Sequence, residues 1–157
     1  MQISGEDPAL IGHGFQSNLL CRDTPTGDFQ VTIHISTIPT SNFQQTAIYL
    51  YEDGDNYIAI NRAFAFGNAI FMEYKITKMP GTYNVKIEAT DLVLRLVRKG
   101  EAITGFYSVE PDQWIKIGAV GNFIKNARIC LGVSNADWNG IDSDLVGRFD
   151  YLDISQP

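Results

Sequence analysis

The chain has 157 residues, of which 45% are hydrophobic and 19% are charged, so it is expected to form one folded domain. Its 12 Lys and Arg residues stand against 18 Asp and Glu residues, a formal net charge of −6. Nucleic acids and anionic membranes attract basic surfaces, so neither is an expected partner. No apolar run approaches the roughly 18 residues of a membrane helix, and the first residues lack a signal-peptide pattern.

The chain has two cysteines and two histidines, too few for a zinc cluster or a disulfide scaffold. Cys21 and Cys130 lie in separate apolar runs. Cysteine is often buried without being bridged, so two buried thiols are the preferred interpretation. A long-range disulfide is the alternative.

Alternation of apolar and polar residues dominates the chain, beginning at residues 29–35. Further β-rich stretches follow at residues 46–51, 57–61, 71–76, 83–87, 92–97, 102–107, 114–117, 127–133 and 146–154. Asp53-Gly54 predicts a hairpin turn, and residues 98–101 predict a second one. Ten or eleven short strands without a convincing helix indicate an antiparallel β-sandwich or barrel. No linker or repeat divides residues 1–157 into further domains.

Three stretches resemble a known module. DTPTGDFQVTIHISTIPTSNFQQTAIYLYEDGDNYIAI, LRLVRKGEAITGFYSVEPDQWIKIG and RFDYLDI follow one another in the order and spacing of the concanavalin A-like, laminin-G-like module at the C-terminus of many β-xylosidases and related glycoside hydrolases. The resemblance covers residues 18–154, and the first residues show no clear opening strand. It implies an antiparallel jelly roll of two packed sheets, one of them concave and able to hold a polysaccharide.

Sugar recognition needs aromatic faces that stack on the pyranose ring and planar polar groups that bond its hydroxyls. Trp138 and Asn139 lie in the polar loop SNADWNGIDSD and are expected to form one wall of such a site. Tyr51, Arg62 and Glu73 are expected to line the concave sheet. The alternatives are a packed loop anchor for Trp138 and a cross-strand ion pair for Arg62 and Glu73.

The resemblance also implies a structural calcium ion, which a carboxylate of the closing strand helps to hold in this superfamily. Asp150 is the position that matches, and Asp28, where an earlier strand opens, is the second candidate ligand. Calcium prefers six to eight oxygen ligands, which two carboxylates alone do not supply.

A catalytic role is not expected. Related sandwiches that hydrolyse β-glucans carry Glu-x-Asp-x-x-Glu on one strand, but here Glu110-Pro111-Asp112 is followed by Ile115 in the place of the second Glu. The sequence therefore predicts a non-catalytic module that binds a poly- or oligosaccharide, extracellular as part of a larger secreted glycoside-degrading protein. The alternatives are a docking module that completes a neighbouring glycosidase domain without binding sugar alone, and a glycoside hydrolase of the same fold.

Overall fold

The structure, a computed structural model, describes residues 2–5, 19–121, 124–135 and 145–157. These residues form twelve strands and no helix, as the all-β prediction required. The strands are β1 (Gln2–Gly5), β2 (Leu19–Asp23), β3 (Phe29–Ile35), β4 (Gln44–Asp53), β5 (Asn56–Phe64), β6 (Asn68–Ile76), β7 (Met79–Lys86), β8 (Leu92–Lys99), β9 (Ala102–Ser108), β10 (Ile115–Gly121), β11 (Arg128–Asn135) and β12 (Leu145–Ser155). Nothing helical in the described ranges is long and apolar enough to span a membrane.

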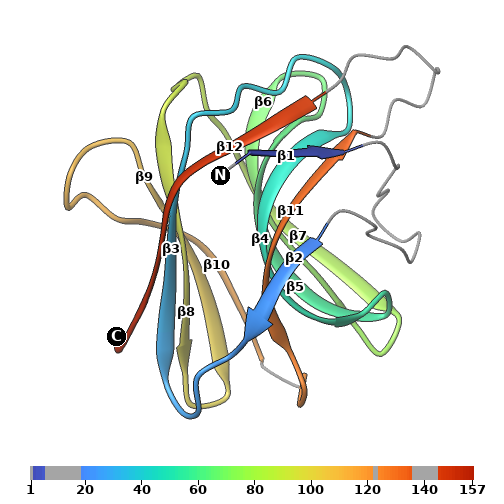
Figure 1. The fold of residues 1–157 in the computed structure, drawn as a ribbon, viewed down its shortest axis with the longest axis vertical. Helices are drawn as coiled ribbons and strands as arrows, with labels where there is room; N and C mark the ends of the chain where they lie inside the picture. Colours follow the sequence, from blue (N-terminus) through green and yellow to red (C-terminus); the bar gives the residue numbers. More distant parts are fainter. Residues whose placement is uncertain (1, 6–18, 122–123, 136–144) are drawn as a thin grey trace.

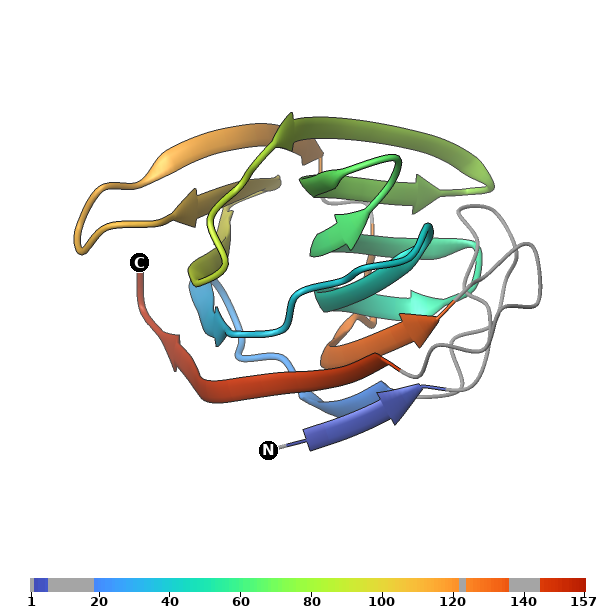
Figure 2. The same cartoon turned by 90° about the horizontal axis from the view of Figure 1, so that it is seen from above.

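The strands form two antiparallel sheets of six strands each. Sheet I has the order β1-β12-β3-β8-β9-β10, and sheet II has the order β2-β11-β4-β5-β6-β7. The two sheets lie on either side of a common interior (Figures 1 and 2). β12 bends between Phe149 and Leu152, where its register with β3 shifts (Figure 1). The architecture is the two-sheet β-sandwich that the sequence predicts.

The core lies between the sheets, because every second residue of the central strands points inward. Sheet I contributes Val31, Ile33, Ile35, Leu92, Leu94 and Leu96, and sheet II contributes Ile48, Leu50, Ile58, Ile60, Ile70 and Met72, each at most 2% exposed. Ile60 lies opposite Ile48 on one side and Met72 on the other, so this row of sheet II faces sheet I. The residues between them, such as Ala59, must point outward.

Both predicted hairpins are confirmed. Tyr51 pairs with Tyr57 across the Asp53-Gly54 turn, and Lys99 pairs with Ala102 across the second turn. The two strands that the sequence did not indicate are the short β1 and β2, which lack a run of alternating residues. β2 nevertheless pairs with β11 along its whole length.

The preferred interpretation of the cysteines as two buried thiols is wrong. Cys21 and Cys130 lie directly opposite each other on β2 and β11, with their Cα atoms 4.0 Å apart, and form a disulfide. The sequence could not show this pairing, because β2 had no pattern that placed Cys21 beside β11. The bond joins residues 109 positions apart and fixes an edge strand to its sheet.

Candidate functional site

The face of sheet II that points away from sheet I carries tyrosines and polar side chains. We call it the tyrosine face and define it by Tyr49, Tyr51, Tyr57, Asn61 and Glu73. Their strands β4, β5 and β6 are consecutive neighbours in the sheet. In the register, Tyr51 lies opposite Tyr57, Tyr49 lies opposite Ala59, and Ala59 lies opposite Glu73.

Small residues between the tyrosines leave room for these large rings. Tyr49 packs edge-on against Tyr57, with ring centroids 6.2 Å apart and the planes at 67°. A Cβ atom on Gly132 of β11 would lie 2.7 Å from the ring of Tyr49, so only glycine accommodates the ring there. Ala47 and Ala59 form a second cluster of buried apolar residues with Tyr49 and are separate from the main core.

The tyrosine rings are partly withdrawn from water, which is reflected in their acidity. Burial, followed by the charge of Glu73, raises the pKa of Tyr57 to about 12. Burial and the nearby Asp53 also raise the pKa of Tyr51. Both hydroxyls are therefore neutral at physiological pH and can donate as well as accept a hydrogen bond.

Glu73 and Asn61 bring buried polar atoms to this outward face. Glu73 is 6% exposed, and its burial raises the pKa of the carboxyl group, against a smaller opposite effect of the Asn61 side chain. Asn61 is 0% exposed, and neither its Oδ1 nor its Nδ2 makes a hydrogen bond of ordinary geometry. Burying an amide whose hydrogen bonds have poor geometry costs free energy.

One end of the tyrosine face is held by an ion pair. Lys75 lies beside Tyr57 in the register, and its ammonium group is 2.7 Å from a carboxylate oxygen of Asp55 in the β4–β5 turn. Lys75 is 8% exposed. The turn itself is fixed by Asp53, whose carboxylate accepts hydrogen bonds from the backbone of Asp55 and the side chain of Asn56.

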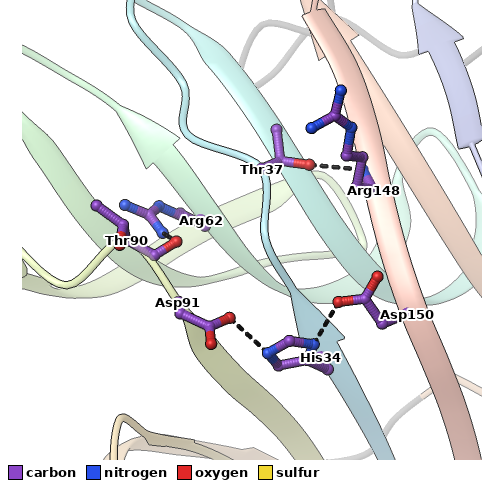
Figure 3. A network of polar contacts seen from close by, with 7 residues as sticks. All are labelled: His34, Thr37, Arg62, Thr90, Asp91, Arg148 and Asp150. Atoms are coloured by element: carbon purple, nitrogen blue, oxygen red, sulfur yellow. Dashed lines mark hydrogen bonds and ion pairs between the residues drawn. The ribbon is translucent and has the colours of Figure 1, made fainter.

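The expectation that Arg62 shares a face with Glu73 is wrong. Arg62 lies opposite Thr46 and Ile70 and points into the sandwich, where it is 0% exposed. Its Nη1 donates a 2.8 Å hydrogen bond to the carbonyl oxygen of Thr90 (Figure 3), while Nε and Nη2 have no partner. Burial lowers the pKa of Arg62, against the opposing effect of Asp91. The cross-strand ion pair with Glu73, the alternative interpretation, is ruled out by the same geometry.

Asp150 and Asp28, the two candidate calcium ligands, do not share a site. Oδ2 of Asp150 lies 2.6 Å from Nδ1 of His34, near the end of β3 (Figure 3). Asp28 precedes the first residue of β3 and accepts a hydrogen bond from the backbone of Gly100. At about 3.3 Å per residue, the six positions between Asp28 and His34 correspond to roughly 20 Å. Among the described residues no group of three or more His, Cys, Asp or Glu is placed to hold a metal ion.

Trp138 and Asn139, the predicted wall of the sugar site, lie outside the described residues. Of the predicted site residues, the structure brings together Tyr51 and Glu73, which lie on the same face in neighbouring rows. It adds Tyr49, Tyr57 and Asn61, which the sequence analysis did not assign to the site. Tyr57 and Asn61 could have been found by extending the period of two through the Asp53-Gly54 hairpin.

Comparison with protein-family models and with curated protein sequences gives no match. Solved structures match over most of the chain. The GH43 protein BlXynB from Bacillus licheniformis has a TM-score of 0.80 and 17% identity over 90% of this chain and 30% of that chain. The bifunctional GH43-CE protein of Bacteroides eggerthii has a TM-score of 0.83 and 13% identity over 99% of this chain and 21% of that chain.

A third match comes from outside the GH43 proteins. The exoplasmic/lumenal domain of VIP36 in a Ca²⁺/Man-bound form has a TM-score of 0.61 and 11% identity over 83% of this chain and 68% of that chain. Identities this low show the fold alone, which is the concanavalin A-like jelly roll that the sequence resemblance predicted. The chain spans less than a third of the length of either GH43 protein.

Proposed function

We propose that this domain is a non-catalytic module that binds a poly- or oligosaccharide on the tyrosine face and serves a glycoside-degrading enzyme. The observation that supports this most directly is the pair of partly exposed tyrosines, Tyr51 and Tyr57, which lie opposite each other on the outward face of sheet II.

The chemistry of this face suits sugar hydroxyls. A hydroxyl both donates and accepts, so it can pair with the neutral hydroxyl groups of Tyr51 and Tyr57, which also donate and accept. The half-buried rings of Tyr51 and Tyr57 can pack against the apolar face of a pyranose. Trp138 and Asn139 remain proposed members of the same site.

The proposed setting is extracellular. Disulfides form and persist in oxidising compartments, so the bond between Cys21 and Cys130 supports a secreted parent protein. The matched GH43 proteins, which are several times longer than this chain, support a catalytic glycosidase domain as its partner. A structural calcium ion also stays a proposal, since no ligand set for it is present among the described residues.

A docking role is the second candidate, and an apolar hollow favours it. The hollow has a volume of about 320 Å³ and lies where β2 of sheet II approaches the bend of β12 in sheet I. Leu20 and Leu152 on its rim are 52% and 36% exposed. A glycosidase domain of the parent protein could cover these side chains, whereas a free sugar would not need them.

A glycan-array screen of the purified domain, with and without calcium, tests the proposal. The expected result is binding to at least one plant or microbial polysaccharide. A blank array with a folded sample would contradict sugar binding and favour docking. In that case Leu20→Ser should weaken association with the catalytic domain.

A further inference from the structure

A pocket that is separate from both the tyrosine face and the apolar hollow lies on the outward face of sheet I. It has a volume of about 420 Å³, within the range of small-ligand sites. Its floor is formed by outward residues of β3 and β8, and its walls come from β12 and from the turn that follows β9. The lining side chains used below are His34, Asp91, Arg95, Asp112, Trp114 and Tyr151. The tyrosine face belongs to sheet II, so the two places are on opposite sides of the sandwich.

His34 lies at one side of this pocket, between Asp91, which also lines the pocket, and Asp150, which does not (Figure 3). Its Nε2 lies 2.5 Å from Oδ1 of Asp91, and its Nδ1 lies 2.6 Å from Oδ2 of Asp150. The imidazole thereby links β3 to the start of β8 and to β12. Only one oxygen of Asp91 contacts the ring, and the Asp91 side chain is 68% exposed. The second oxygen of Asp91 can accept a hydrogen bond from a ligand.

Arg95 places a rigid donor at the other side. Its guanidinium carbon lies 3.6 Å from the ring centroid of Trp114, and its Nε donates a 2.9 Å hydrogen bond to Oγ1 of Thr32. Burial lowers the pKa of Arg95, while Tyr151, Asp153 and Asp112 act in the opposite direction. The head group is therefore held in one orientation by stacking and bonding.

Two aromatic rings supply apolar surface beside these polar groups. Trp114 is half-buried, and Tyr151 is 48% exposed. Tyr151 lies parallel to the imidazole of His34, with ring centroids 5.9 Å apart and planes at 9°. Carboxylates, a fixed guanidinium and two rings thus converge on one cavity.

We propose that this pocket is a second ligand site, and that its ligand is a short neutral saccharide. Hydroxyl groups can donate to Asp91 or Asp112 and accept from Arg95 at the same time, and a pyranose face can pack on Tyr151. An acidic saccharide would meet the lining carboxylates of Asp91, Glu110 and Asp112, and a cationic group would have to avoid Arg95 on the floor.

The consequence is a domain with two binding faces. Two polysaccharide chains, one bound on each face, would be cross-linked by the domain. A single branched chain bound on both faces would be held with increased apparent affinity. This inference does not require the tyrosine face to bind sugar, because none of the residues of the pocket belongs to it.

The test is a ¹⁵N NMR titration of the full chain with xylohexaose, cellohexaose and mannohexaose as separate probes. The expected result is that at least one probe shifts the amide signals around Asp91 and Tyr151. Tyr151→Ala and Asp91→Asn should each weaken that response at least tenfold. Tyr51→Ala should leave it unchanged. Ile115→Ala, an exposed apolar change on β10, is the control and should also leave it unchanged.

The outcomes separate the two proposals. Shifts confined to the tyrosine face would overturn the second site and keep the proposed function. Shifts confined to the pocket would support the second site and contradict the proposed function. If no neutral probe shifts any pocket signal up to 10 mM (about −2.7 kcal/mol), the pocket proposal is overturned. Binding of only oligogalacturonate or chitosan hexaose there would overturn the neutral ligand class.

Discussion

Arg62 and Glu73 belong to adjacent strands of sheet II and lie on its opposite faces. Arg62 of β5 lies opposite Ile70 of β6, whereas Glu73 of β6 lies opposite Ala59, three residues before Arg62. An odd separation along a strand reverses the face. One side chain is therefore part of the interior and the other is part of the tyrosine face, which leads to separate predictions for each.

Arg62 is expected to serve packing and to make no contribution to ligand binding. Arg62→Met should fold with unchanged or higher thermal stability, because it removes a buried charge while keeping most of the volume. Thr90 is exposed, so its carbonyl can bind water instead. Arg62→Ala should lose about 2–5 kcal/mol of unfolding free energy by leaving a cavity. Urea denaturation measures the unfolding free energy of both variants. A large loss of stability in Arg62→Met would contradict this prediction and show that the hydrogen bond from Arg62 to Thr90 is essential.

Glu73 should make the stability of the domain depend on pH. Burial raises the carboxyl pKa above its usual value of 4.5, so the folded state binds more protons than the unfolded state above that pH. Stability should therefore fall as the pH rises from about 4.5 through the raised pKa. Glu73→Gln should remove this fall, being more stable than the parent at pH 7 and equal to it at pH 4.

Melting temperatures measured between pH 4 and pH 8 check the Glu73 prediction. Glu88→Gln, at an exposed position, is the matched control and should follow the parent curve. If Glu73→Gln lowers stability at pH 7, the carboxylate is stabilised by partners, and the account of its burial is wrong.

Asn61 is expected to lower the stability of the domain. Asn61→Leu replaces a buried amide, whose atoms make no hydrogen bond of ordinary geometry, with an apolar group of similar volume. We expect a gain of about 1–3 kcal/mol in unfolding free energy. Asn84→Leu, at an exposed position of β7, is the stability control and should change little. A less stable Asn61→Leu variant would contradict the assignment of its amide as unsatisfied.

Reducing the disulfide should destabilise the domain strongly. Cys21 and Cys130 close a loop with a separation of 109 residues. The chain-entropy relation then predicts a loss of about 4–5 kcal/mol on removing the bond. The double variant Cys21→Ala/Cys130→Ala measured in urea gives this difference, and the parent with and without reductant gives an independent value. No change with reductant would indicate free thiols.

The sequence predicted the strands with alternating residues better than the two short edge strands, β1 and β2. Residues 29–35 coincide with β3 because strict alternation marks a strand that is buried on one face. β1 and β2 have four and five residues and no alternation, so only pairing with β12 and β11 reveals them. A pairing of that kind joins distant segments, and local pattern contains no information about it.

The same limit explains the site. Tyr51 and Glu73 are expected on one face because sugar binding needs an aromatic ring beside a polar group. The face of Arg62 depends on the register between β5 and β6, which the local pattern does not contain. His34 alternates with Ile33 and Ile35, which places it on the outward face of its strand. Its contacts with Asp91 and Asp150 depend on the neighbours of β3 in sheet I, which become visible only in the folded chain.

The most direct test of the central claim is calorimetry of the parent, Tyr51→Ala and Tyr51→Phe with an oligosaccharide identified by the glycan array. The account predicts at least a tenfold loss of affinity in Tyr51→Ala, about 1.4 kcal/mol, with most of the affinity kept in Tyr51→Phe, because the ring stacks without its hydroxyl. Circular dichroism should show that both variants stay folded. Unchanged affinity in Tyr51→Ala would contradict the assignment of the tyrosine face as the sugar-binding surface.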